Sequence, residues 1–445
     1  RGAMFTHLLS KKSEEQLMTG YVDDTSINIS KSENELRDEM QKAIQKWEEL
    51  LFTTGGKLEI SKCFYYHMKW EVDEDDRPRL AGTSQTKIEI NQSEDKKRIQ
   101  IEQKSPHEAS RVLGVMCAPD LNCDAQALSV KNRSNSIAKR VQAASFSIHM
   151  VELAYRTTYI PSISYSLPAT FMTRSTCDKI QAPATRIFLA MKGFNPNFPR
   201  IVAYAPKTIG GHGMTRLHTK QGVEGTLMFL KHTRANTKLG EKMEINEAWH
   251  RVWSGIGEEL LENPRSAIPP ITRGWLCNIR EFLKQCGASV HTGRTEKTIR
   301  QKDEFIMKFF LEMDWSTREI EQINRCRLFL NVSRISDIAS ADGKNIQAEW
   351  KKPEGEKNSF SKTCWPKIRA PNETSWKTWD SALKKLTDGQ DRLTTPLGRW
   401  IVDPKRFRVH RFVYSPSEKR VFERTPGGYV TYKKRGEIRR EWVFE

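Results

Sequence analysis

The chain has 445 residues, and its 73 Lys and Arg against 55 Asp and Glu give a formal net charge of +18. This excess predicts polyanionic partners, with nucleic acid first and an anionic membrane surface second. A mean hydropathy of −0.65, with no run of about 18 apolar residues, argues against a membrane-spanning helix. The eight cysteines form no CxxC pair and no secretory leader follows Arg1, so we expect an intracellular, reduced protein, nuclear or cytoplasmic.

Two adjacent aspartates near the start of the chain are the strongest chemical signal. Tyr21-Val22-Asp23-Asp24 precedes the polar run 25–29, which predicts a strand, a tight turn that carries the acids, and a second strand. Carboxylates on a rigid turn are ligands that Mg²⁺ prefers, and two ions held there would clamp the attacking and leaving oxygens of a phosphoryl transfer. The alternative is a solvated hairpin tip.

An amphipathic helix is predicted next. Ser32 and Glu35 match a capping box, and Gly55-Gly56 provides the positive φ at which helices end. Apolar residues recur along this helix at steps of three and four, and we expect the resulting stripe to pack on the sheet that carries the aspartates. The stripe comprises Leu36, Met40, Ala43, Ile44, Trp47, Leu50 and Leu51.

The pattern then predicts strands. An aromatic-rich strand from Leu58 to Trp70 contains Lys62, whose ammonium group would offset developing negative charge or donate a proton; the alternative is an exposed strand lysine. Lys57 is a weaker candidate for the same role. Two alternating stretches, 87–90 and 98–102, predict a hairpin, and the apolar run 111–116 predicts a short strand with a glycine.

The order of these elements resembles the second half of the palm of reverse transcriptases from retroelements. Tyr21-Val22-Asp23-Asp24 is similar to motif C of that family, and the run 54–63 is similar to its motif D. Leu113-Gly114-Val115 is similar to the primer-grip motif. The resemblance covers about residues 15–235.

This resemblance implies roles for individual residues. Asp23 and Asp24 would bind two Mg²⁺ ions, Tyr21 and Val22 would line the nucleotide and primer site, and Lys62 would assist the departure of pyrophosphate. Leu113, Gly114 and Val115 would seat the primer end, because a glycine allows a close approach of the primer backbone.

Helices are predicted from about residue 120, over 124–159 and 173–192. In the family a helical thumb follows the primer grip and tracks the template–primer duplex, so the resemblance implies that basic faces bind phosphates here; the alternative is a solvated basic face. The basic residues of the first helix are Lys131, Arg133, Lys139 and Arg140. Gly210-Gly211-His212-Gly213 is similar to an element found after the thumb in non-LTR polymerases, and it predicts either a phosphate cradle or a turn.

More helices are predicted over 220–345, followed by strands near the C-terminus. The stretches 408–414, 419–424 and 428–432 interleave basic and aromatic residues, which is typical either of a platform for single-stranded nucleic acid or of a small β-module with charged faces. The spacing of Cys277, Cys286, His291 and Cys326 matches no zinc knuckle, so we expect free or buried thiols.

The expected fold class is α+β, in which a partial polymerase palm (an antiparallel sheet plus a helix) precedes a mostly helical region and a small basic β-rich tail. The expected parts are 1–118, half of a palm; 119–235, a thumb-like region; 236–350, a helical region; 351–375, a linker; and 376–445, the tail.

One departure from the family affects the expected activity. The family has a further metal-binding aspartate in motif A, upstream of motif C, and residues 1–20 contain no aspartate. We therefore expect a truncated RNA-directed DNA polymerase, inactive as this chain, with weak Mg²⁺ binding and with RNA template and DNA primer as partners. The alternatives are a non-catalytic nucleic-acid-binding remnant and a helical scaffold with accidental motifs.

Overall fold

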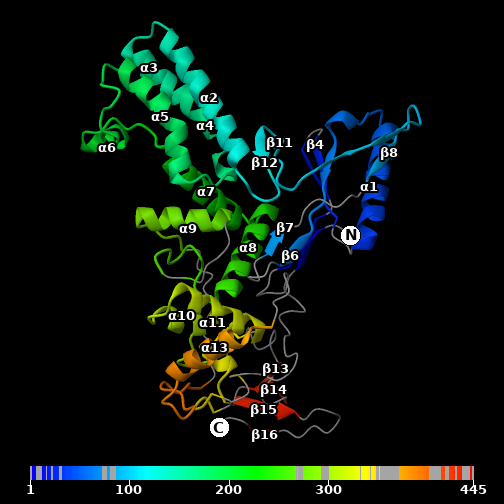
Figure 1. Cartoon of the computed structure of the whole chain (residues 1–445), viewed down its shortest axis with the longest axis vertical. Coiled ribbons are helices and arrows are strands. Elements are labelled where there is room, and N and C mark those ends of the chain that lie inside the picture. The colour runs from blue at the N-terminus through cyan, green and yellow to red at the C-terminus, as the bar shows by residue number, and fades with distance from the viewer. Residues whose placement is uncertain are drawn as a thin grey trace. The chain divides into compact units, whose positions relative to one another are not determined.

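The computed structural model describes most of the chain as two compact units (Figure 1). Unit 1 comprises Arg1–Glu71, Pro78–Asn246 and Arg273–Cys286, and unit 2 comprises Val72–Arg77, Glu247–Thr272 and Gly287–Glu445. The described residues are 3–6, 13–16, 18–21, 24–29, 33–72, 78–80, 87–266, 268, 274–291, 300–330, 332–340, 342–346, 350, 370–399, 412–415, 420–425, 428–432 and 441–442. Of these, the backbone alone is described for 3–6, 13–16, 19–21, 24, 33–34, 70, 72, 78–79 and all residues after 400.

The chain is of the α+β class, but its grouping differs from the expected boundaries. Residues 1–118 and 119–235 share one unit, and the division between the units falls inside α8 (Lys238–Ser254). The expected boundary at 375/376 falls inside α13 (Glu373–Lys385), whose Trp376 and Trp379 are buried. None of the described helices is long and apolar enough to cross a membrane.

The strands of the first 118 residues pair in twos. The paired strands are β1 (Ala3–Thr6) with β2 (Ser13–Gln16), β3 (Met18–Tyr21) with β4 (Asp24–Ile27), β6 (Trp70–Val72) with β7 (Pro78–Leu80), β8 (Glu89–Asn91) with β9 (Arg98–Gln100), β11 (Ser110–Val112) with β12 (Val115–Cys117), and β10 (Glu102–Lys104) with β5 (Phe64–Tyr66). The β8–β9 pair confirms the predicted hairpin. The β10–β5 pair is parallel, so the expectation of a purely antiparallel sheet is wrong.

Helix α1 (Glu33–Thr53) packs on β8 through both apolar and polar side chains. Met40 and Ile44 contact the cluster of Ile60, Tyr65, Ile88, Ile90 and Ile101. Gln41 Oε1 accepts a hydrogen bond from the Glu89 amide at 2.9 Å and its amide nitrogen donates to the Glu89 carbonyl. Gln45 pairs in the same way with Asn91, at 2.9 and 3.0 Å.

The predicted end of this helix is confirmed, but its apolar stripe differs from the prediction. The Gly55-Gly56 end is confirmed, because Gly55 has φ +79° and the Gly56 amide donates to Leu51 O at 2.8 Å. The apolar stripe is shorter than expected, since Leu50 is 50% exposed. Within the stripe, Met40 and Ile44 pack against the cluster around β5 and β8.

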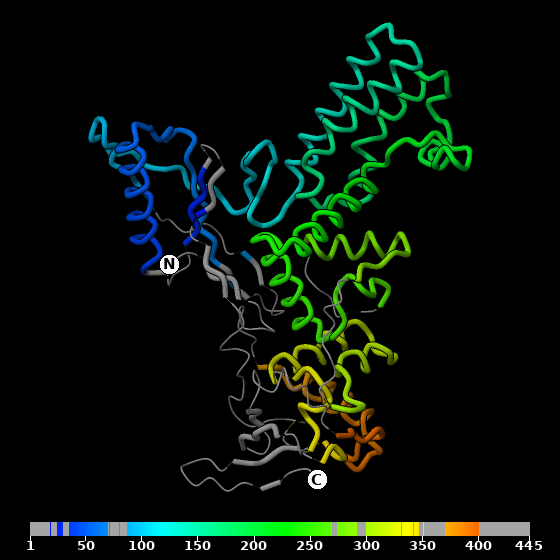
Figure 2. The backbone as a smooth tube through the Cα atoms, turned by 180° about the vertical axis from the view of Figure 1, so that it is seen from behind, coloured from blue at the N-terminus to red at the C-terminus, as the bar shows by residue number. Residues whose placement is uncertain are grey.

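Residues 119–235 form a helical bundle with one buried core, in which α2, α3, α4 and α5 lie side by side (Figure 2). The elements are α2 (Asp124–Ala143), α3 (Ile148–Ala154), the π-helix η2 (Tyr155–Tyr159), α4 (Ile160–Ser164), η3 (Leu167–Ala169), α5 (Arg174–Met191), α6 (Arg200–Tyr204), η4 (Lys207–Ile209) and α7 (Leu217–Arg234). The predicted helix 173–192 is confirmed, with Thr173 as its N-cap. The single predicted helix 124–159 is wrong, because the chain leaves the helix at 144–147 and Ser147 caps α3.

Helix α9 (Trp275–Cys286) also belongs to unit 1 and packs on α7. The contact is close because α7 presents Gly222 and Gly225 to it; a Cβ added to Gly222 would lie 2.2 Å from the ring of Phe282. The indole nitrogen of Trp275 donates to Pro168 O at 2.7 Å. Cys277, Cys286 and Cys326 form no disulfide among the described residues, and Cys326 is buried.

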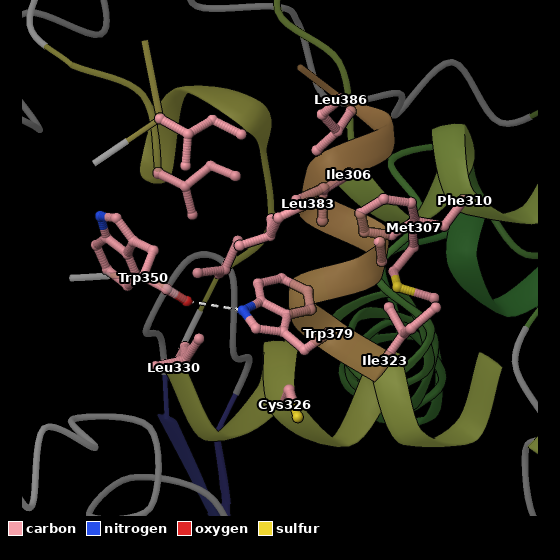
Figure 3. Packing of buried hydrophobic residues seen from close by; sticks show 14 of the residues in the cluster. Ile306, Met307, Phe310, Ile323, Cys326, Leu330, Trp350, Trp379, Leu383 and Leu386 are labelled. Atoms are coloured by element: carbon pink, nitrogen blue, oxygen red, sulfur yellow. Dashed lines mark hydrogen bonds between the residues drawn. The ribbon is translucent and has the colours of Figure 1, made fainter. Parts of the chain in front are cut away.

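Unit 2 has its own core, built from α10 (Ile306–Leu311), α11 (Thr317–Leu330) and α13. Figure 3 shows Trp379 among Ile323, Leu383 and Met307, with its indole nitrogen donating to Trp350 O at 2.8 Å. Buried Arg327 binds the end of α8, donating to the carbonyls of Val252 and Trp253 at 2.8 Å each.

The predicted C-terminal strands are confirmed as one antiparallel sheet. It contains, in spatial order, β13 (Phe412–Ser415), β14 (Arg420–Thr425), β15 (Gly428–Tyr432) and β16 (Glu441–Trp442).

Candidate nucleic-acid interface

Asp24, the second residue of the aspartate pair, is the first residue of β4 in a β-hairpin. Strands β3 and β4 are antiparallel, and Tyr21 pairs with Asp24, so the two predicted strands are confirmed for the backbone. Val22 and Asp23 lie outside the described residues, as do the side chains of Tyr21 and Asp24. Where side chains are described, no group of three or more His, Cys, Asp or Glu is arranged to hold a metal. The magnesium site therefore stays a prediction.

Lys62 lies on a tight turn and not within a strand. The predicted strand 58–70 is confirmed only at β5 and at the first residue of β6, because the 3₁₀ turn η1 (Ile60–Lys62) occupies its first part. The side chain of Lys62 is exposed. Lys57 forms an ion pair with Glu94 at 2.5 Å, and this hydrogen bond raises the pKa of Lys57. Of the two lysines, Lys62 is thus the one without an ion-pair partner in the described structure.

The Leu113-Gly114-Val115 run forms the tip of a hairpin and not the single strand predicted over 111–116. Val112 pairs with Val115, and the two residues between them have positive φ, +47° for Leu113 and +83° for Gly114. Glycine adopts this left-handed conformation freely, whereas for leucine it costs about 1–2 kcal/mol. Leu113 is nevertheless 44% exposed, so burial does not explain its presence at the tip.

The hairpin is fastened to the first part of the helical bundle. The Tyr165 hydroxyl donates to Leu113 O at 3.0 Å, directly at the tip. On β12, the Met116 amide donates to Gln126 Oε1 of α2 at 2.6 Å, and the Gln126 amide nitrogen donates to Ser166 Oγ at 2.8 Å. Gln126 is buried and its bond to Ser166 is shielded from water, so Gln126 is a firm anchor for β12 on α2.

The positive charge of unit 1 is concentrated in the bundle. Residues 119–235 hold fifteen Lys and Arg against five Asp and Glu, whereas residues 1–118 hold eighteen against twenty-one. Three of the five acids are already paired within the bundle: Glu152 with Lys192, Asp178 with Arg216, and Glu224 with Lys220. A surplus of cationic side chains remains for an external anion.

The four predicted basic residues of α2 are all exposed and are spread over the solvent-facing half of the helix, which we call the α2 basic face: Lys131, Arg133, Lys139 and Arg140. Arg133 donates to Ser162 O at 3.2 Å and Arg140 to Ser136 Oγ at 3.1 Å, so their hydrogen bonds are to neutral oxygens. No ion pair within the described part of the chain neutralises these four residues. Helix α2 thus carries the basic face and also binds β12 of the hairpin through Gln126.

The glycine run 210–213 does not form a phosphate cradle. Each amide from Gly210 to Met214 donates to a carbonyl between residues 202 and 207, at 2.8–3.1 Å, so none is available to a phosphate. Gly211 is required by packing, because a Cβ there would lie 2.1 Å from Ala205 O. His212 lies against the rings of Phe194 and Phe198. Of the two predictions for this run, the turn is confirmed.

Sequence reasoning missed Gln126 and Tyr165, which position the hairpin tip, because neither belongs to a local motif. Comparison with known proteins gives no further assignment: no family model, no curated protein and no solved structure matches the chain.

Proposed function

We propose that this chain is part of an RNA-directed DNA polymerase of the retroelement kind, and that it holds the primer end and binds the template–primer duplex. The observation that carries the proposal is the hairpin tip. An exposed leucine held at positive φ is a locally unfavourable arrangement, and such arrangements persist where the surrounding structure enforces them and function uses them. The tip is fastened to the helix that carries the α2 basic face.

In this proposal each part has a separate task. The α2 basic face binds phosphates and sets the position of the duplex without reading its sequence. Leu113 contacts the primer end, and Gly114, which has no side chain, allows the primer backbone to approach. Lys62 lies near the departing pyrophosphate, where an ammonium group offsets negative charge.

Asp23 and Asp24 fit Mg²⁺ by the chemistry of their donors, because carboxylate oxygens are its preferred ligands and the two residues are adjacent in the sequence. Bound Mg²⁺ would supply positive charge to the reacting phosphates. Two carboxylates alone would hold the ion weakly, because octahedral Mg²⁺ needs further oxygen ligands.

Primer extension and duplex binding test the proposal together. On an RNA template with a recessed DNA primer and Mg²⁺, we expect residues 1–445 to bind with a Kd on the order of 10⁻⁶ M and not to extend the primer. Binding to the recessed duplex should exceed binding to a blunt duplex of equal length, because only the former offers a primer end to the tip. Equal affinity for both would contradict the proposal.

The controls separate the two alternatives. When binding is measured without Mg²⁺, Asp23→Ala/Asp24→Ala should leave duplex affinity unchanged, because neither residue is proposed to bind phosphates of the duplex in the absence of metal. If the unmodified chain extends the primer and the double variant does not, the active site is complete and the expected inactivity is refuted. A purely non-catalytic binding protein, the second candidate, is favoured by the charge of the bundle and would show no preference for a recessed end.

Leu113→Asn separates stability from function at the tip. Asparagine tolerates the left-handed conformation, so the hairpin should gain about 1 kcal/mol and its amides should exchange about 5-fold more slowly. Affinity for the recessed duplex should nevertheless fall about 3-fold, because an apolar contact is lost. Hydrogen exchange of residues 110–117 and titration with labelled duplex measure the two effects. A more protected hairpin with unchanged affinity would exclude Leu113 from the primer site.

A further inference from the structure

A second basic surface lies in the bundle, in a hollow between α5, α6 and the start of α7. Its volume is about 720 Å³. Arg174 of α5, Arg200 of α6, and Arg216 and Lys220 at the start of α7 supply four cationic side chains to its lining. The residues come from positions up to 46 apart in the chain, so no local motif marks this hollow, which we call the α5–α7 groove.

The charges of the groove are only partly compensated. Arg216 forms two bonds to Asp178, at 2.6 and 3.1 Å, and Arg174 lies 4.0 Å from the same carboxylate. Lys220 pairs with Glu224 at 2.6 Å. Two carboxylates therefore face four cations. Arg200 donates through Nη2 to Pro196 O at 2.8 Å, and no carboxylate pairs with it in the described structure.

The electrostatic surroundings of the groove agree with its excess of positive charge. The pKa of His218, at the start of α7, is lowered first by burial and then by the positive charges of Arg216 and Arg174. The first turn of α7 contains no acidic residue. An anion in the groove would thus enter a region of positive potential.

The lining of the groove also includes apolar side chains that are exposed. Ile201 is 81% exposed, Val223 also faces solvent, and the ring of Tyr204 lies beneath the guanidinium of Arg216 with 5.9 Å between them. A duplex keeps its bases stacked inside, so it cannot place a base on such a lining, whereas an unpaired base adds its flat face to apolar and aromatic side chains.

We propose that the α5–α7 groove binds single-stranded nucleic acid, with backbone phosphates on Arg174, Arg200, Arg216 and Lys220 and an unpaired base on Ile201 and Tyr204. An acidic peptide offers carboxylates to the cations but has no flat apolar group for this lining, so the observations favour the nucleotide. This site goes beyond the proposed function, because it requires neither the aspartates nor the hairpin tip.

The test uses the full chain and a fluorescein-labelled oligouridylate of about 12 nucleotides. Arg174→Gln/Lys220→Gln should weaken binding about 10-fold and reduce the slope of log affinity against log salt by about 1.4, which is about 0.7 for each lost phosphate contact on a single strand. Ile201→Ser, at an exposed position, should weaken binding about 3-fold and leave the slope unchanged, because it removes no charge.

Lys231→Gln is the matched control, since Lys231 is an exposed lysine on the same helix α7 and outside the groove. It should bind oligouridylate as the unmodified chain does. Unchanged oligouridylate affinity in both groove variants would overturn the proposal. So would a labelled oligoglutamate of the same length that binds as tightly and with the same sensitivity to Arg174→Gln/Lys220→Gln. If the chain binds recessed and blunt duplexes equally well, the proposed function is contradicted, but the proposal for the α5–α7 groove is not.

Discussion

Replacing Lys131, Lys139 and Arg140 together by glutamine is expected to weaken binding of an RNA–DNA hybrid on the order of 50-fold at 0.15 M salt. The three side chains are exposed on α2 and have no carboxylate partner in the described structure, so each is available to a phosphate. Each phosphate contact releases condensed counterions, and the salt slope should fall by about 0.9 for each contact on a duplex. Fluorescence anisotropy at several salt concentrations gives both quantities.

The control for this variant must change the net charge equally at another place. Lys308, Arg318 and Lys377 are exposed on three helices of unit 2, and their joint replacement by glutamine lowers the charge by the same amount. If the α2 basic face binds the duplex, this control should lose little affinity. Equal losses in the two triple variants would mean that overall charge, and not the α2 basic face, determines binding.

Arg327→Met is expected to destabilise unit 2 by about 3–5 kcal/mol, the largest effect on stability that we predict. Arg327 is 1% exposed, and burial lowers the pKa of its guanidinium. Besides binding Val252 and Trp253, it donates to Asn324 Oδ1 at 2.9 Å and to Val332 O at 3.1 Å. Methionine fills a similar volume but leaves the carbonyls at the end of α8 without these donors.

Urea unfolding of the full chain, with hydrogen exchange to locate the change, measures this effect. Amides of α11 and α13 should lose protection, while those of α2 and α5 in unit 1 should keep theirs. Arg327→Lys is the informative comparison, because it retains the positive charge but cannot reach four acceptors. A loss below about 1 kcal/mol in Arg327→Met would mean that water replaces the guanidinium at these carbonyls.

Periodic features of the sequence predicted the fold well. The helix 173–192 and the hairpin 87–102 were predicted because their apolar residues recur at fixed steps over several turns or pairs. The turn at Leu113-Gly114 was missed because leucine is a poor residue for positive φ, so the run looks like an uninterrupted apolar strand. The break after α2 was missed because residues 144–147 contain neither glycine nor proline.

The candidate site likewise contains residues that the sequence indicated and residues that it did not. Asp23 and Asp24 were found from the sequence because adjacent carboxylates at a turn form a local pattern. Gln126 and Tyr165, which hold the hairpin tip, are far from it in sequence and are common residue types. Only tertiary packing brings such residues together, and no local periodicity reports on it.

The glutamine side chains of α1 have a consequence for how the protein behaves at high concentration. A strand at the end of a sheet offers unpaired amides and carbonyls to any other extended chain, which invites aggregation. On β8 the side-chain amides of Gln41 and Gln45 occupy the backbone groups of Glu89 and Asn91 that face away from β9. The helix therefore takes the place of a neighbouring strand. This edge of β8 is then not available to pair with a strand of another molecule.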